Sequence, residues 1–146
     1  MKDCLICERV SLAEERKNTF LIHEFKNSFF VIGDHQFFKG YSLLILKQHS
    51  RELHDLLPDV QMELFQELMT AGKAVFEAFQ PWKMNYSCYG NQIPHVHWHI
   101  FPRYESDPYH LNNPWLNSKQ FEKHPIQEAE KIESIEKIRS KLNGRI

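Results

Sequence analysis

Five short runs of apolar residues, each bounded by polar or turn-forming residues, predict five β-strands. These runs cover residues 19–23, 29–32, 41–46, 84–89 and 95–101. Between the last two runs lie Gly, Asn and Pro residues, which favour a turn. We therefore expect these two strands to form a hairpin.

Two stretches show the three- and four-residue spacing of an amphipathic helix. In the first, which runs from Pro58 to Phe79, the apolar positions are Leu64, Phe65, Leu68, Val75, Phe76 and Phe79. Pro58 suits the first helical turn, and Pro81 ends the helix. In the second, the apolar positions are Ile126, Ala129, Ile132, Ile135, Ile138 and Leu142. This second stretch predicts a C-terminal helix, with acidic residues near its start and basic residues near its end, as the helix dipole favours.

No internal repeat, low-complexity tract or linker divides the 146 residues, so we expect a single domain over residues 1–146. Residues 104–123 form a long irregular segment that contains proline and several aromatic residues. Such a segment is either a lid or dimer-crossing arm beside an active site, or a strap over the core.

Charge and hydropathy exclude several classes of partner. The formal net charge is −1, from 18 basic and 19 acidic residues, so the whole-chain charge attracts neither nucleic acid nor an anionic membrane. No apolar run approaches the roughly 20 residues of a membrane span, and the start lacks a secretory apolar region. Three cysteines suit a reducing compartment. We expect a cytoplasmic protein.

The most informative pattern is a row of alternating histidines in the last predicted strand. On a strand, His95, His97 and His99 share one face, and Val96, Trp98 and Ile100 share the other. Three neighbouring imidazoles repel one another when protonated and lose solvation, so stability alone does not favour them. The row indicates a function. Metal binding and nucleophilic catalysis at phosphorus both use such a row, and the periodicity does not choose between them.

The segment from His95 to Phe101 resembles the His-x-His-x-His-x-x signature of the histidine triad (HIT) superfamily, and Pro102 and Arg103 continue the match. Residues 40–49 resemble the family's Gly-His, apolar strand, Lys-x-His segment. The amino-terminal Cys-x-x-Cys is a third match, in the same order along the chain.

The resemblance covers the core, residues 4–103, and leaves a C-terminal extension, residues 104–146. It implies an α+β fold, in which an antiparallel sheet of about five strands carries one long central helix and a C-terminal helix. It also implies a homodimer. Residues 90–94, before the triad, resemble the branch of diadenosine polyphosphate hydrolase-like HIT proteins.

The resemblance further implies a nucleotide hydrolase or transferase that cleaves at the α-phosphate through a nucleotidyl-histidine intermediate on His97. A backbone carbonyl is expected to hold the Nδ1 proton of His97, so that Nε2 attacks. His99 is expected to hydrogen-bond the phosphate oxygens. Catalysis then needs no divalent metal, and the substrate is a nucleotide such as diadenosine polyphosphate or adenosine phosphoramidate.

Five residues are predicted to contact the substrate: Asn85, Asn91, His95, Asp34 and Tyr41. Asn91 falls where many members carry a phosphate-contacting Gln or Asn, and Asn85 resembles a family Asn near the leaving group. For both asparagines the alternative is a turn. Asp34 lies one position from the family's ribose-binding acid. Tyr41 replaces the histidine of the Gly-His pair, and its hydroxyl is predicted to contact phosphate instead.

Cys4 and Cys7 have the spacing of a zinc knuckle but supply only half of a tetrahedral site. In several HIT relatives the other two ligands correspond to His49 and His95, so the resemblance implies a structural Cys₂His₂ zinc site. The alternative is a small buried cysteine pair beside a surface His49.

Two other functions stay open at the level of sequence. One is a zinc-dependent hydrolase in which His95, His97 and His99 bind the metal beside an open water position. The other is a catalytically silent nucleotide-binding protein, since Tyr41 replaces a family histidine.

Overall fold

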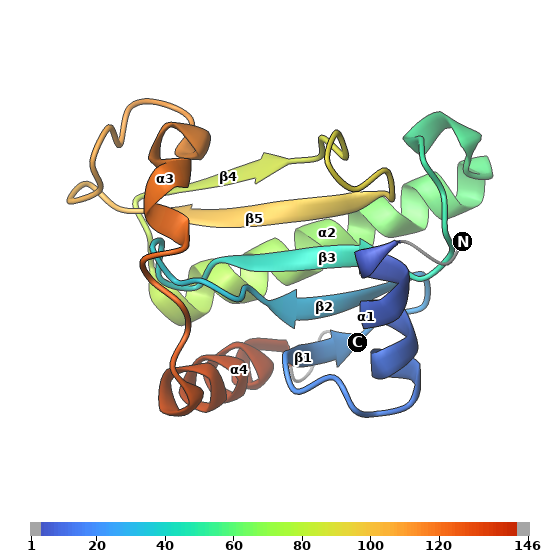
Figure 1. Cartoon of the computed structure of the whole chain (residues 1–146), viewed down its shortest axis with the longest axis horizontal. Helices are drawn as coiled ribbons and strands as arrows, with labels where there is room; N and C mark the ends of the chain where they lie inside the picture. Colours follow the sequence, from blue (N-terminus) through green and yellow to red (C-terminus); the bar gives the residue numbers. More distant parts are fainter. Residues whose placement is uncertain (1–3, 143–146) are drawn as a thin grey trace.

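A five-stranded antiparallel sheet in the order β1-β2-β3-β5-β4 forms the middle of the computed structural model, which describes residues 4–142 (Figure 1). Its strands are β1 (Leu21–Glu24), β2 (Ser28–Ile32), β3 (Ser42–Leu46), β4 (Lys83–Ser87) and β5 (His97–Arg103). The predicted α+β fold is confirmed, and β4 and β5 are antiparallel neighbours as expected for the hairpin. The strand limits differ from the predicted ones by no more than two residues.

The long helix α2 (Pro58–Phe79) has the predicted bounds and covers one face of the sheet. It ends at Phe79, and the capping residue Gln80, whose φ of 49° is left-handed, stands immediately before Pro81. Its buried apolar residues include Leu64, Leu68, Ala71, Val75 and Ala78. Phe65 and Phe76, which we predicted in the core stripe, are 57% and 47% exposed. Each follows a buried position directly, so it lies about 100° further round the helix.

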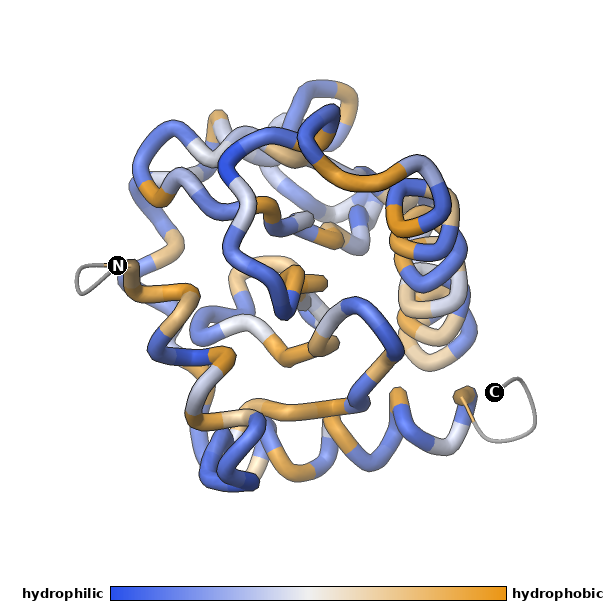
Figure 2. The backbone as a smooth tube through the Cα atoms, turned by 90° about the vertical axis from the view of Figure 1, so that its right-hand side faces the viewer, coloured by the Kyte–Doolittle hydropathy of each residue, from blue (hydrophilic) through white to orange (hydrophobic). Residues whose placement is uncertain are grey.

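The C-terminal helix α4 (Glu128–Leu142) packs beside α2 on the same face, with Ile135, Ile138 and Leu142 in the shared core. Ile132, which the sequence placed in the buried stripe, is exposed. The amino-terminal helix α1 (Leu5–Glu14) was not predicted. It packs on the opposite face, against the alternate residues of β2 and β3, and the turned view of Figure 2 places it across the sheet from α2.

The irregular segment after β5 also packs on the face that carries α1. It contains the short 3₁₀ helix η2 (Pro114–Asn117) and α3 (Ser118–Phe121), and a second 3₁₀ helix, η1 (Leu53–Asp55), precedes α2. Phe121 is buried in a cluster with Phe38, Tyr41 and Phe101. The segment therefore straps one end of this face, α1 lies toward the other end, and the middle of β5 lies between them (Figure 1).

Between residues 4 and 142, none of the helices combines the length and the apolar character that crossing a membrane requires.

Candidate active site

His97 is the first residue of β5, and a hydrogen bond to the backbone of His95 holds its ring in one tautomer. Its side chain is buried, with 7% of the residue exposed, and Nδ1 lies 2.6 Å from the backbone oxygen of His95. A carbonyl oxygen only accepts hydrogen bonds, so Nδ1 carries the proton and donates it. In the neutral ring, Nε2 therefore keeps a free lone pair. This is the arrangement that a nucleophilic or general-base histidine requires.

His99 lies two residues further along the same face, and its ring centroid is 5.0 Å from that of His97. Desolvation by burial, followed by the neighbouring His97, lowers the pKa of His99 to about 3. The ring is therefore neutral near pH 7. A neutral imidazole has one donor and one acceptor nitrogen, and the partner of Nδ1 decides which is which.

That partner is Tyr41, whose hydroxyl oxygen lies 2.7 Å from His99 Nδ1. Burial raises the pKa of Tyr41 far above its usual range, so the hydroxyl stays protonated. Among residues 4–142, His99 Nδ1 is its one hydrogen-bond partner, so the hydroxyl satisfies its proton by donating to Nδ1. The ring proton of His99 is thereby assigned to Nε2. Tyr41 is only 4% exposed, so the hydroxyl that we predicted on phosphate is engaged by His99 instead.

The position of the Tyr41 ring depends on its neighbours. The ring stacks between His35 and Phe101, at centroid distances of 4.4 and 4.6 Å. The Tyr41 ring also lies directly against Gly33, because a β-carbon at residue 33 would be only 2.2 Å from the ring. Only glycine at residue 33 therefore allows Tyr41 to reach His99 in this way.

His97 and His99 line a hollow of about 390 Å³. The other lining residues are Tyr89, Gly90, Asn91, Gln92, Ile93, Asn113 and Trp115. Asn91, which we predicted as a phosphate contact, thus lies in the same hollow as His97 and His99. The sequence did not identify Asn113 and Trp115, which come from the segment after β5. The Trp115 ring stands edge-on to the His99 ring, with 4.9 Å between centroids.

Two other predicted substrate contacts lie outside this hollow. Asn85 lines a neighbouring hollow along β4, and its side-chain oxygen accepts a hydrogen bond from Arg103 at 2.8 Å. Asp34 follows β2, and its exposed carboxylate pairs with Arg9 of α1 at 3.8 Å. The structure therefore does not bring Asp34 to the hollow that contains His97.

Arg103, at the end of β5, fixes the segment that supplies Asn113 and Trp115. It is 1% exposed and donates to Asp107 at 3.2 Å and to the backbone oxygens of Asn112 and Tyr109 at 2.7 and 3.3 Å. From the sequence, Arg103 was identified only as part of the family match. Its role is spatial, because it joins the end of the histidine strand to the wall of the hollow.

Cys4, Cys7, His49 and His95 converge on one point, and their ligand atoms all lie within 4.8 Å of one another. His95 Nε2 donates to the backbone oxygen of Leu46 at 2.8 Å, which leaves Nδ1 directed at the cysteine sulfurs, at 3.6 and 3.5 Å. His49 Nδ1 lies 3.2 Å from Cys7 Sγ. Tetrahedral zinc separates such N and S ligands by about 3.5 Å, so two sulfurs and two imidazoles at this spacing fit the ion.

Within residues 4–142, these four side chains form the one candidate group of metal ligands. The three triad histidines do not form a group, because the His95 ring faces the cysteines. Both ring nitrogens of His95 are engaged there and on Leu46, so neither is free for the substrate contact that we predicted.

Strand β5 thus presents the buried His97 and the half-buried His99 on one face beside a hollow, which is the arrangement expected of a histidine-triad protein. The model of the HIT domain family matches residues 14–106, and the chain belongs to this family. No curated protein sequence matches the chain.

Solved structures of histidine triad proteins share the fold. A histidine triad protein of Sinorhizobium meliloti is 22% identical, with a TM-score of 0.75 over 88% of this chain and 94% of that one. A hypothetical histidine triad nucleotide-binding protein of Sulfolobus tokodaii is 17% identical, with a TM-score of 0.73 over 93% and 91%. A Zn-bound histidine triad family protein of Mycobacterium smegmatis is 20% identical, with a TM-score of 0.69 over 97% and 94%.

The buried histidines make folding stability depend on pH. His35 stacks between Tyr41 and Phe121, its buried Nδ1 has no hydrogen-bond partner, and desolvation lowers its pKa from 6.5 to about 4. Between pH 6.5 and pH 4 the unfolded chain binds this proton and the folded chain does not. Stability is therefore fully present above pH 6.5 and falls as the pH drops. We expect the His35→Phe variant to show a flatter fall, in urea unfolding between pH 7 and pH 5.

His54→Gln is the matched control, since it replaces an exposed histidine that lies outside this cluster of rings, and it is expected to keep the slope of the wild type. An equal slope for His35→Phe and the wild type would contradict the assignment.

Proposed function

We propose that this protein is a nucleotide hydrolase or transferase that cleaves at the α-phosphate, with His97 as the nucleophile. The observation that carries the proposal is the 2.6 Å hydrogen bond from His97 Nδ1 to the His95 carbonyl, which in the neutral ring puts the free lone pair on Nε2, beside a hollow shared with His99. A buried imidazole with a fixed tautomer serves nucleophilic attack better than a surface histidine, which samples both tautomers.

The reaction proceeds in two displacements. The Nε2 lone pair of His97 attacks the α-phosphorus, and the bond from phosphorus to the bridging oxygen or nitrogen breaks, with its electron pair going to the leaving group, which takes up a proton. Water then attacks the nucleotidyl-histidine, the P–N bond breaks, and its electron pair returns to Nε2. The products are the nucleoside monophosphate and a proton. In a transferase, another nucleophile replaces water.

His99 donates from Nε2 to a non-bridging phosphate oxygen. Its side chain is neutral, and Tyr41 sets the position of its proton. The hydrogen bond therefore strengthens as negative charge develops on the phosphate oxygen in the transition state, although a neutral ring does not attract an anion at long range. The amide of Asn91 and the ring of Trp115 supply polar and planar contacts for the rest of the nucleotide. Asp34 is proposed as a ribose contact only for a nucleoside that extends past this hollow.

The substrates that we propose are a dinucleoside polyphosphate, such as diadenosine polyphosphate, and adenosine phosphoramidate. A nucleotide partner is supported by the Sulfolobus tokodaii relative, which is described as a hypothetical histidine triad nucleotide-binding protein.

The replacement His97→Ala should lower kcat/KM for adenosine phosphoramidate and diadenosine triphosphate by more than about a thousandfold, because the nucleophile is lost. The measurement is AMP release in the presence of EDTA, with acid quenching and intact mass spectrometry to detect the adenylyl adduct of the wild type. His54→Ala, an exposed histidine, is the matched control and keeps the wild-type rate.

Two outcomes support the alternatives. Loss of wild-type turnover in EDTA, with no adduct and an unchanged circular dichroism spectrum, favours a zinc-dependent hydrolase. AMP binding without any turnover favours a silent nucleotide-binding protein.

We also propose that Cys4, Cys7, His49 and His95 bind a structural zinc ion. The ligand spacing and donor set support this, and the Zn-bound relative of Mycobacterium smegmatis has the same fold. Such an ion would join α1 to the residues that follow β3 and precede β5, and so would anchor the amino-terminal segment to the sheet.

Purified protein is expected to contain about one zinc ion per chain, and Cys7→Ser to lose most of it and to melt more than about 5 °C lower. Elemental analysis and thermal unfolding measure the two effects. Cys88→Ser is the matched control, since Cys88 lies outside the cluster. This variant is expected to retain the metal. A fully loaded Cys7→Ser protein would refute the ligand set.

The homodimer implied by the family resemblance is a further part of this proposal. On α2, the apolar residues Met62, Phe65, Met69 and Phe76 are exposed at spacings of three, four and seven residues, so they form one stripe. The exposure of Phe76 argues against its packing in a monomer core. A two-fold axis beside α2 would bury the stripe against its own copy.

Sedimentation velocity is expected to give twice the 17.5 kDa mass of the chain, and Phe65→Glu to give the monomer. Leu5→Glu, at an exposed apolar position of α1, is the matched control and stays dimeric. A monomeric wild type would contradict the proposed homodimer.

A further inference from the structure

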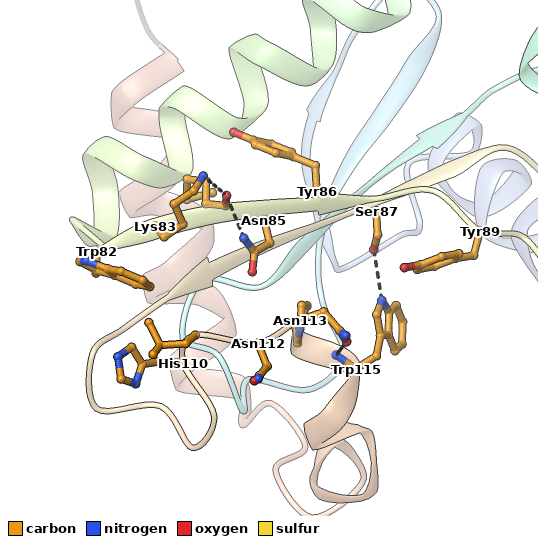
Figure 3. A pocket seen from close by; sticks show the side chains of 13 residues that line it. Trp82, Lys83, Asn85, Tyr86, Ser87, Tyr89, His110, Asn112, Asn113 and Trp115 are labelled. Atoms are coloured by element: carbon orange, nitrogen blue, oxygen red, sulfur yellow. Dashed lines mark hydrogen bonds between the residues drawn. The ribbon is translucent and has the colours of Figure 1, made fainter.

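A second hollow, of about 530 Å³, follows β4 on the catalytic side of the sheet (Figure 3). In the antiparallel pairing of β4 with β5, Asn85 pairs with Phe101 and Ser87 pairs with His99. Directly paired residues point to the same face, so Asn85 and Ser87 share the face of His99. The hollow therefore lies immediately beside the proposed site of reaction.

Trp115 separates the two hollows. Its ring contacts His99 on one side, and its indole nitrogen donates to the Ser87 hydroxyl at 3.3 Å (Figure 3). Tyr89, Asn113 and Trp115 line both hollows, so the two spaces adjoin. One extended molecule can thus occupy both, with its reacting phosphate at His97.

The far end of the second hollow presents two aromatic rings. Trp82 is 48% exposed, and the His110 ring stands perpendicular to it at a centroid distance of 5.4 Å (Figure 3). Lys83 and Asn112 also line this hollow, and the Lys83 ammonium group donates to the backbone oxygen of Met84 at 2.9 Å (Figure 3). Exposed aromatic rings stack on planar bases, and ammonium and amide groups bind phosphate oxygens.

One wall of this hollow comes from a part of the chain that the family match does not include. The match ends at residue 106, and His110, Asn112 and Asn113 follow it. Arg103 holds this segment through its bonds to the backbone oxygens of Tyr109 and Asn112. The hollow is therefore preorganised, which lowers the entropic cost of binding.

We propose that this second hollow binds the leaving part of the substrate, and that this part is a nucleotide with a planar base stacked at Trp82 and His110. This inference rests on the proposed function, because the leaving group is defined by attack of His97 on the other end. On the cleavage of an α-phosphate bond, the departing nucleoside phosphate keeps the bridging oxygen and its electron pair. It remains bound along β4 until release.

The test compares a substrate that has a second nucleotide with one that does not. For diadenosine triphosphate the leaving group is a nucleotide, and for adenosine phosphoramidate it is ammonia. Loss of one stacking ring weakens base binding about tenfold. The ratio of the kcat/KM values for the two substrates is therefore expected to fall about tenfold in Trp82→Ala and in His110→Ala. Trp82→Phe retains a ring and keeps most of the ratio.

His54→Ala is the matched control for His110→Ala, because it removes an exposed histidine that lies outside both hollows. An unchanged ratio in Trp82→Ala and His110→Ala overturns the proposal, as does an equal loss of activity on both substrates. A changed circular dichroism spectrum would show that a variant is misfolded. If Trp82→Ala misfolds, His110→Ala carries the test, and Trp82→Phe is still expected to keep most of the ratio.

Failure of the proposed function is distinguishable from failure of this subsite. If the wild type cleaves neither substrate, isothermal titration with AMP and with diadenosine triphosphate tests the hollow directly. Tighter binding of the dinucleotide that is lost in Trp82→Ala supports the subsite. Equal binding of the two ligands overturns it.

Discussion

The hydrogen bond from His97 to the carbonyl of His95 is the interaction on which the candidate site depends. It holds the proton away from the nitrogen that faces the hollow, and it does so through a backbone atom that no side-chain substitution at residue 95 removes. The carbonyl is itself fixed by the His95 ring, which bonds to Leu46 of β3 on one side and faces the two cysteines on the other. One residue thus joins a candidate metal centre to a candidate nucleophile, with its ring in the first and its backbone in the second.

The electrostatic character of the site follows from burial rather than from charge. Desolvation keeps His99 and His35 neutral, and Tyr41 stays protonated between them. The stacked rings of His35, Tyr41 and Phe101 carry no net charge, and they set the direction of one proton on His99. A neutral donor of this kind gains most when negative charge grows on its partner, which is the condition for selective stabilisation of a transition state.

The fold was largely predictable because its signals are local. The apolar spacing of α2 and the apolar runs of the strands are visible within a few residues of sequence. The three triad histidines occupy alternate positions of one short segment. The short helix α1 was missed because only Ile6, Val10 and Ala13 are buried in it, and Ile6 lies within the Cys-x-x-Cys motif. Arg103 and Trp115 act through contacts with distant parts of the chain, which leave no periodic trace. Tyr41 was identified as a departure from the family pattern, but its partner His99 is 58 residues away and only the structure pairs them.

The order of the strands has a kinetic consequence. β5 is inserted between β3 and β4, so the histidine strand pairs on one side with a strand that the chain left more than fifty residues earlier. The long helix α2 must carry the chain across the sheet before this pairing can form, and contacts of such long range are slow to close. The pairing that places His97 and His99 in the sheet is therefore expected to form late in folding. Because β5 is also the last strand along the chain, synthesis reaches these histidines only after the other four strands have been made.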